Sequence, residues 1–320
     1  MRVAREQGAG EQRAEEQAGE ELLASVVIPH YNDKIRLQVC LASLETQSVP
    51  RHRYQIIVAD NGTPGGVADV AARFPAVRFV EERRKGAAHA RNAAVAVATG
   101  AALAFIDADC VAEPEWLEEG VRALEGADLA GGAIRLTARE EDAPTAVEVF
   151  EMMFGFRQQQ YIEKQKFAVT ANLFARRSVF AAVGGFRHGL AEDTDWCWRA
   201  TAAGYTLRFA PKAKVSHPAR HDWSELVAKW QRLVEEKYNG MRQQRGFAPR
   251  WLLLALLVAG SSVPHGLQVL LSRNAIVSRR RLATVAVLAR IRLWRSRRML
   301  ALLAGAGRRP GAAAEGARGR

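Results

Sequence analysis

Two aspartates one residue apart are the clearest chemical signal in this chain. Asp107-Ala108-Asp109 directly follows the apolar run at residues 103–106. Where a strand ends, alternate side chains turn toward the same side, so both carboxylates can face one cleft. Hard oxygen ligands of this kind suit Mn²⁺ or Mg²⁺, and such a cation would neutralise a diphosphate leaving group as the bond to it breaks. A solvated Asp-rich turn would have the same sequence.

A second group of carboxylates occurs at residues 192–195, Glu-Asp-Thr-Asp. A carboxylate in a cleft can act as the general base that takes the proton of an attacking hydroxyl. The same residues also suit the first turn of a helix, where negative charge favours the helix dipole and Asp is a good cap. Both roles can hold at once. Asp195, from which the chain runs straight into a helical segment, is the residue assigned to the cap or to positioning.

The elements before residue 130 alternate between short apolar runs and segments of helical period. This pattern predicts an α/β fold with a mostly parallel sheet flanked by crossover helices. Ligands of open α/β sheets bind at the carboxyl ends of the strands, where His30-Tyr31-Asn32 and Asp60-Asn61-Gly62 follow the first two apolar runs. We expect strands at 24–29, 55–59, 77–81 and 103–106, and helices at 35–47, 67–74 and 87–98.

The chain divides into five expected segments. Residues 1–21 and the tail at 305–320 have compositions typical of disorder. Residues 22–130 form the half that carries the aspartate pair, and residues 131–220 form a second half on the same sheet. In that second half we expect a helix at 147–161 and strands at 167–174 and 213–216. Residues 221–304 are expected to be a helical, basic and apolar appendage.

The net charge of +12 is concentrated near the C-terminus. Eight arginines between Arg279 and Arg298 meet no acidic residue within their own segment. The apolar segment 251–271 is borderline for a membrane span and contains Pro264, so a surface-lying or re-entrant segment fits at least as well. Residues 282–293 have the character of an interfacial helix attracted to anionic lipid. We therefore expect an anionic membrane surface, and not a nucleic acid, as the partner of this charge.

Three scattered cysteines lack the spacing of a zinc site or a disulfide framework, which indicates a reducing compartment. Residues 1–21 lack the apolar core of a signal peptide. We expect a cytoplasmic protein associated with the inner face of the cell membrane.

Four sequence blocks in order, with their spacing, resemble the family 2 glycosyltransferases of the GT-A fold. The resemblance covers residues 24–217, because it continues through Gly184-Gly185-Phe186 and the carboxylates at 192–195. The blocks are Val-Val-Ile-Pro-His-Tyr-Asn at 26–32, Ile-Val-Ala-Asp-Asn-Gly at 57–62, Gly-Ala-Ala-His-Ala-Arg-Asn at 86–92 and Phe-Ile-Asp-Ala-Asp at 105–109.

The resemblance implies a role for each block in binding a nucleoside-diphosphate sugar. Pro29 and Tyr31 would line the nucleobase pocket, and Asp60 would bind the edge of the base. Arg91 and Asn92, on the helix after Gly86, would serve the phosphates or cap a charged pocket. Asp107 would contact ribose and metal, with Ala108 beside it, and Asp109 would bind metal and diphosphate.

The second half would then supply the acceptor side of the reaction. Asp193 matches the position of the general base, which would make the enzyme inverting, and Glu192 matches an acceptor-contacting neighbour. Asn172 lies on the acceptor-side strand, where its amide could read a sugar or satisfy a local backbone group. His217 could complete the Mn²⁺ or Mg²⁺ site or be a structural histidine.

Departures from the family narrow the expected activity. The Gln-x-x-Arg-Trp block of processive synthases is missing, since Lys229-Trp230-Gln231-Arg232 lacks that order, so we expect a non-processive enzyme. The acceptor is expected to be a glycan or a lipid-linked glycan of the cell envelope. Two alternatives stay open: an inactive relative that binds a nucleotide or lipid at the membrane, and a sugar nucleotidyltransferase. The second would normally carry a Gly-rich loop after the first strand, where this chain has Pro29-His30-Tyr31-Asn32.

Overall fold

The computed structural model describes residues 22–305, in two compact units. The first, which we call the sheet unit, holds the described residues up to Arg135 together with Phe156–His188 and Glu192–His217. The second, the helical unit, holds Leu136–Gly155, Gly189–Ala191 and the described chain from Pro218 onward. The segments expected to be disordered lie outside the described residues, apart from Gly305.

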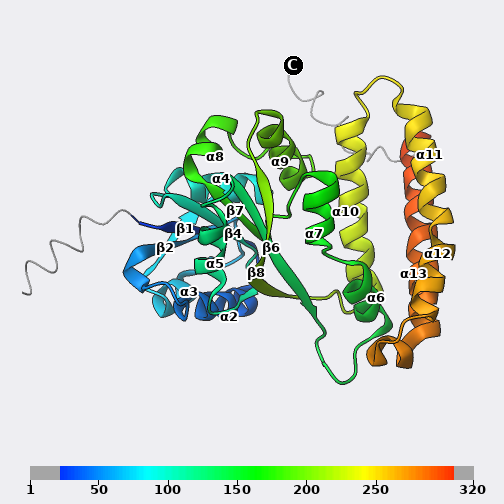
Figure 1. Ribbon diagram of the computed structural model, residues 1–320, viewed down its shortest axis with the longest axis horizontal. Coiled ribbons are helices and arrows are strands. Elements are labelled where there is room, and N and C mark those ends of the chain that lie inside the picture. Colours follow the sequence, from blue (N-terminus) through cyan, green and yellow to red (C-terminus); the bar gives the residue numbers. More distant parts are fainter. Residues whose placement is uncertain (1–21, 306–320) are drawn as a thin grey trace, which may run out of the picture. The chain divides into compact units, whose positions relative to one another are not determined.

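The first four long strands of the sheet unit are parallel and come in the order expected for a crossover fold (Figure 1). The first three end at the polar residues His30, Asp60 and Glu81, and the fourth ends at Ile106, directly before Asp107. The strands are β1 (Ala24–His30), β2 (Tyr54–Asp60), β3 (Val77–Glu81) and β4 (Ala102–Ile106), connected by α2 (Lys34–Glu45), the short 3-10 turn Arg51–Arg53, α3 (Ala68–Arg73) and α4 (Ala87–Ala96).

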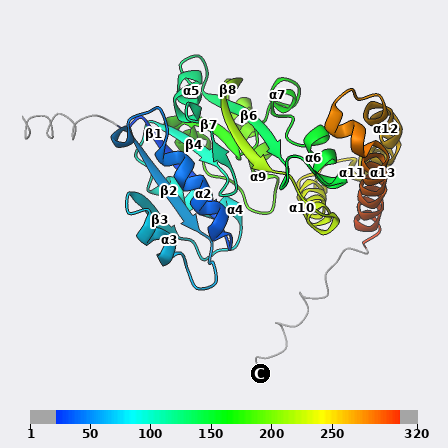
Figure 2. The same ribbon diagram turned by 90° about the horizontal axis from the view of Figure 1, so that it is seen from below.

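The second half extends the same sheet with strands of mixed direction. The strand order is β3-β2-β1-β4-β7-β6-β8-β5, and all of these strands except β5 are labelled in Figure 2. Strand β7 is antiparallel to both β4 and β6, so the parallel prediction holds for the first half and the whole sheet is mixed. The added elements are β5 (Val111–Ala112), α5 (Trp116–Ala123), β6 (Leu129–Thr137), β7 (Asn172–Arg176), α8 (Arg177–Val183), α9 (Glu192–Ala202) and β8 (Leu207–Pro218).

Alternate side chains of the central strands feed two apolar cores. Val26 and Ile28 of β1 pack with helices α2, α3 and α5, whereas Val27 packs on the other side with α4, α8 and α9. All three side chains are fully buried. The ribbon shows α2 and α3 on one side of the sheet and α4 and α8 on the other (Figure 1). Strands buried on both faces read as continuous apolar runs, which is why these strands are visible in the sequence.

The helix expected at 147–161 is interrupted. Helix α6 (Ala146–Phe154) begins with a capping box between Thr145 and Glu148 and ends at Gly155. A Cβ at Gly155 would lie 2.8 Å from the Glu151 carbonyl oxygen, so only glycine allows this tight exit. After Phe156 the chain resumes as α7 (Gln158–Gln160) and a π-helical turn, Tyr161–Gln165. The strand expected at 167–174 begins only at Asn172.

The helical unit contains the long helices of the appendage. The indole of Trp251 is fully buried and donates to the Met299 carbonyl at 2.9 Å, which fastens α11 to α13. Arg298 pairs with Glu235 at 2.6 Å, so this arginine does have an acidic partner, supplied by another helix. The helices are α10 (Trp223–Met241), α11 (Phe247–Gly260), α12 (Ser262–Leu270) and α13 (Ala275–Leu303).

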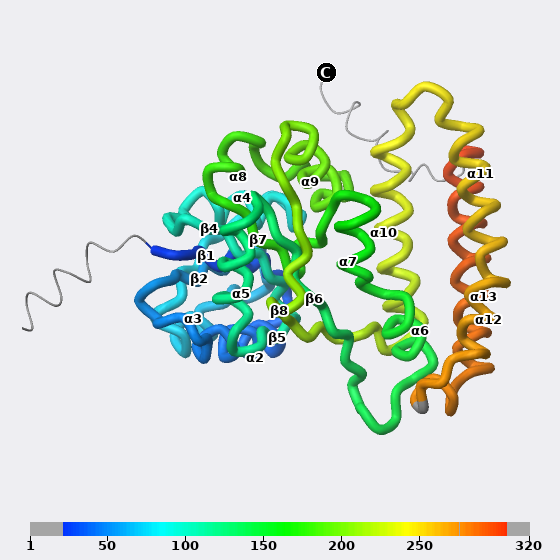
Figure 3. The backbone as a smooth tube through the Cα atoms, in the orientation of Figure 1, coloured from blue at the N-terminus to red at the C-terminus, as the bar shows by residue number. Residues whose placement is uncertain are grey.

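Helices α11 and α12 form one apolar stretch that lies along α13 (Figure 3). By length and composition, Phe247–Leu270 is the one stretch among the described residues that could cross a bilayer; it has 24 residues and contains an 18-residue window with a mean hydropathy of 1.6. Pro264 is the third residue of α12, where a helix does not need its N–H. The break therefore falls at Ser261, between the two helices.

Candidate active site

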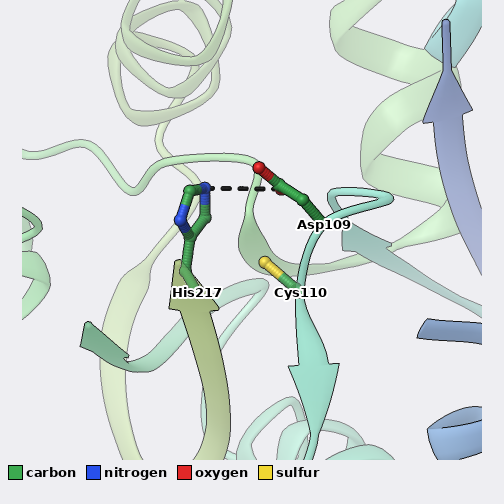
Figure 4. A group of neighbouring side chains, drawn as sticks. All are labelled: Asp109, Cys110 and His217. Carbon is green, nitrogen blue, oxygen red and sulfur yellow. Dashed lines mark ion pairs between the residues drawn. The ribbon is translucent and has the colours of Figure 1, made fainter. Parts of the chain in front are cut away.

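The pairing of β5 with β8 brings the aspartate pair to a histidine. Val111 lies opposite Ser216 in this antiparallel pair, so the neighbouring residues Cys110 and His217 also come together. The Nε2 atom of His217 lies 3.4 Å from a carboxylate oxygen of Asp109, and the two side chains point toward one another (Figure 4). The imidazole is buried, whereas a quarter of the Asp109 side chain is exposed.

Three potential metal ligands meet at this place. One ligand atom each of Asp109, Cys110 and His217 lies within 4.8 Å of the others. Cys110 is fully buried, and its sulfur is a soft ligand, whereas Mn²⁺ and Mg²⁺ prefer oxygen and imidazole ligands. Carboxylate oxygen and imidazole nitrogen remain, a donor set that fits Mn²⁺ better than a soft metal.

Arg91 is the buried centre of the site. Its guanidinium donates to Asp107 at 2.7 Å and to Glu192 at 2.5 Å, and its side chain is only 5% exposed. Burial alone would lower the pKa of Arg91, but the two carboxylates outweigh burial and raise it, so the cation persists. The residue expected at the donor phosphates thus joins the strand-end loop to the start of α9.

Asp193 lies in the first turn of α9, next to Glu192. Its Oδ1 atom accepts a hydrogen bond from the Thr194 backbone at 2.7 Å. Burial, followed by the charge of Glu192, raises the pKa of the Asp193 carboxyl. A carboxylate whose pKa is raised is a stronger base than an ordinary aspartate.

The nucleotide end of the expected site contains one exposed ring and one buried carboxylate. Tyr31 is 54% exposed, and the Lys85 ammonium lies 4.5 Å from the centre of its ring. Asp60 is buried and accepts from the Thr63 hydroxyl at 2.5 Å, and the His30 ring lies 3.2 Å away. Lys85, His30 and Thr63 were not predicted for the site.

Two smaller residues of the expected donor site contribute little side-chain chemistry. Pro29 is half-buried and lies in register with Ala59 of β2. The methyl group of Ala108 packs against the apolar core on the α2 side of the sheet. Ala108 is only partly buried there, so it can still border a donor.

Two asparagines expected at substrates have their side chains occupied within the protein. Asn92 donates to the Phe186 carbonyl at 2.8 Å and accepts from the Phe186 amide at 2.9 Å. Asn172 is fully buried, accepts from Trp116 and donates to the Ala133 and Ala213 carbonyls. The expectation for Asn172 needs correction, because both N–H groups of its fully buried amide are used to tie strands together. Asn92 holds the Gly-Gly-Phe loop with one N–H and the oxygen of its amide, and its role at the phosphates stays a prediction.

Asn61 also has a structural role. Its amide donates to the carbonyls of Glu82 and Arg84 at 2.8 Å and accepts from the Gly86 backbone at 2.7 Å. A carboxylate could not donate these two hydrogen bonds. Asparagine at this position therefore organises the loop that carries Lys85.

A family model described as glycosyl transferase family 2 matches residues 25–184, half of the chain. The chain belongs to glycosyltransferase family 2. The glycosyltransferase AglE of Haloferax volcanii is 34% identical to this family 2 chain over 249 residues, which cover 75% of this chain and 81% of AglE. The succinoglycan biosynthesis protein ExoM of Rhizobium meliloti is 31% identical over 227 residues, 63% of this chain and 72% of ExoM.

A solved structure gives the fold of this family 2 chain. The mannosyltransferase PcManGT from Pyrobaculum calidifontis, in complex with GDP-Man and Mn²⁺, superposes with a TM-score of 0.56 at 18% identity. The match covers 93% of this chain and 83% of the mannosyltransferase. The prediction of a GT-A fold is confirmed. The family assignment favours a transferase over the sugar nucleotidyltransferase alternative.

Proposed function

We propose that the sheet unit transfers a sugar from a nucleoside-diphosphate sugar to an acceptor hydroxyl with inversion and without processivity. The observation that carries the proposal is the convergence of Asp109 with His217 at one strand edge. These two residues, with Asp107, would hold Mn²⁺ or Mg²⁺, which supplies charge neutralisation for the diphosphate. The mannosyltransferase of the same fold was solved with a nucleotide sugar and Mn²⁺, which supports this choice.

In the proposed reaction Asp193 takes the proton of the acceptor hydroxyl. The hydroxyl oxygen forms a bond to the anomeric carbon as the bond from that carbon to the diphosphate oxygen breaks. The proton ends on Asp193 and the nucleoside diphosphate leaves with the electron pair. A single displacement inverts the anomeric centre. Tyr31 and Asp60 would bind the base, while Arg91 fixes Asp107 and Glu192 in place.

We also propose that the helical unit rests on the cytoplasmic face of an anionic membrane and that the acceptor is a glycan or a lipid-linked glycan. The side of α11 and α12 away from α13 exposes large apolar side chains at helical spacing, among them Leu253, Leu256, Leu257 and Leu267. Such an apolar face packs well into the acyl boundary of a bilayer. Lipid is therefore the proposed partner of this apolar face.

A surface position fits this unit better than a span. Helix α13 packs along both α11 and α12 and carries eight arginines and no acidic residue. If α11 and α12 crossed the bilayer, α13 would bring these cations into hydrocarbon, at a cost of about 2.5–3.5 kcal/mol each. At the surface the same cations meet anionic headgroups.

The donor assay tests the transferase proposal. Hydrolysis and binding are measured over a panel of nucleotide sugars with Mn²⁺ or Mg²⁺. We expect one donor to bind with a requirement for metal and to be turned over. If no donor binds, the alternative of an inactive membrane-bound relative replaces the proposal.

A further inference from the structure

A groove of about 470 Å³ lies in the sheet unit beside the aspartate site, a size in the usual range for ligand pockets. It lies between strand β6 and the segment that follows Gly155. Its lining combines two aromatic rings with amides and charges: Phe156, Phe209, Gln159, Gln160, Glu163 and Lys164. None of these six residues belongs to the donor site or to the metal site.

The groove is adjacent to the metal-binding histidine. The ring centre of Phe156 lies 4.8 Å from that of His217, and His217 in turn contacts Asp109. One aromatic contact therefore separates the end of the groove from the residues that would hold the donor diphosphate.

The wall of the groove has an unusual backbone. Phe156 has φ +41°, in the left-handed region that bulky residues avoid, and Lys166 closes the π-helical turn with φ +58°. Left-handed residues of this kind and π-turns concentrate at functional sites. The segment is held in this shape by Gln158, whose buried amide donates to the Asn172 carbonyl and accepts from the Val169 amide, both at 3.0 Å.

The chemistry of the lining fits a sugar better than a diphosphate. A pyranose presents an apolar C–H face, which suits the aromatic rings, and hydroxyls, which suit amides that both donate and accept. The lining charges are of both signs, with Glu163 among Arg157 and Lys164, whereas a diphosphate site would need a clear excess of donors and cations. A neutral glycosyl unit is therefore the matching ligand.

We infer that this groove is the subsite for a neutral sugar unit of the acceptor. The inference rests on the proposed transferase function and gives it an acceptor class, a glycan end whose terminal sugar is uncharged. The Gln159 amide donates to the Glu163 carboxylate at 2.8 Å, so the Gln159–Glu163 pair and the Gln160 amide would hydrogen-bond the sugar hydroxyls.

The test compares two variants of one segment. The double variant Gln159→Ala/Gln160→Ala removes both groove amides, and Gln165→Ala removes the exposed amide of the same π-turn outside the groove. The probes are the methyl glycosides of glucose, galactose, mannose and N-acetylglucosamine. Their binding to the full chain is measured by saturation-transfer NMR. Equal melting temperatures of the three proteins serve as the folding control.

We expect at least one methyl glycoside to bind wild type and Gln165→Ala equally and to bind the double variant about tenfold more weakly, from two lost hydrogen bonds. Equal binding to all three proteins, or no binding of any glycoside to wild type, overturns the inference. Metal-dependent donor hydrolysis in water, measured in parallel without glycoside, should be unchanged in the double variant. If wild type itself shows no metal-dependent donor hydrolysis, the transferase proposal is refuted instead.

Discussion

The Arg91 guanidinium lies 2.7 Å from a carboxylate oxygen of Asp107, so the first aspartate of the pair is neutralised by a buried cation of the protein itself. The other arm of the same guanidinium binds Glu192 at the start of α9. The loop after β4 and the start of α9 are therefore both paired with the same guanidinium. Asp109 pairs instead with His217, whose Nε2 atom lies 3.4 Å from its carboxylate.

Replacing Arg91 with Leu should strongly destabilise the fold. Two carboxylates would be left without their cation, and removing one member of a buried ion pair costs roughly 3 kcal/mol. Urea unfolding measures the change. Arg83→Leu is the matched control, because Arg83 pairs with Glu81 in full contact with solvent and such pairs contribute about 0–1 kcal/mol. Equal midpoints for the two variants would contradict a structural role for Arg91.

Asp193→Asn should slow transfer strongly and yet stabilise the protein at neutral pH. Loss of a general base lowers the rate by about 10²–10⁴-fold, while donor binding is retained. The pKa of Asp193 is raised by folding, so its ionised form opposes folding, and the opposition grows as the pH rises through the folded pKa. The amide keeps the Oδ1 acceptor for Thr194. Thermal unfolding at pH 5 and pH 8 should show the larger gain at pH 8.

The pH profile of transfer should report the same carboxyl. The base must be ionised, so kcat/KM falls as the pH drops through the raised pKa of Asp193, at a higher pH than for an ordinary aspartate. Glu192→Gln removes a charge that raises this pKa, so the acid limb should move to lower pH. If the acid limb of kcat/KM stays at the same pH in Glu192→Gln, a group other than Asp193 controls the pH profile.

The metal site should depend on Asp109 and His217 but not on Cys110. We expect Asp109→Asn and His217→Ala to weaken Mn²⁺-dependent donor binding, by at least about 100-fold for Asp109→Asn, because a cation supplies several kcal/mol of charge stabilisation. Cys110→Ala should bind Mn²⁺ as wild type does, because a soft sulfur ligand does not suit this cation. Titration calorimetry with Mn²⁺ and donor measures each case. Loss of metal in Cys110→Ala would show that the thiolate is a ligand.

Membrane binding should depend on exposed arginines of α13. Arg290 stacks on Trp223 at 4.0 Å, Arg297 lies two turns further along the same side of the helix, and both border a groove with Trp294. Neither has an acidic partner among residues 22–305. Arg290→Gln/Arg297→Gln should lose roughly tenfold or more in affinity for vesicles with anionic lipid, at about 1 kcal/mol per cation.

The control variant for the membrane is Arg36→Gln, an exposed arginine of the sheet unit that pairs with Asp33. Vesicle flotation at low and at high salt measures both proteins. The loss should shrink at high salt, where the headgroup attraction is screened. Identical flotation of the α13 variant and wild type at low salt would show that these two arginines do not contribute to membrane binding.

The sequence by itself determined the parallel half of the sheet and the position of its polar strand ends. Strands such as 24–30 and 102–106 are buried on both faces, so they appear as apolar runs, and parallel strands deliver their carboxyl ends to one edge. Asp107, Asp109 and the carboxylates of α9 stand out in the sequence for a similar reason, because each group lies within a few neighbouring residues of the chain.

Only the tertiary structure decided which side chains meet and which are already used. The His217–Asp109 contact depends on the register of the two-residue strand β5 against β8, and a pairing so short leaves no pattern in the sequence. Asn92 and Asn172 looked available for ligands, but their partners come from distant segments. The break after Gly155 likewise follows from contacts made across the fold. Local propensity and spacing cannot encode these features, because each is a relation between residues far apart in the chain.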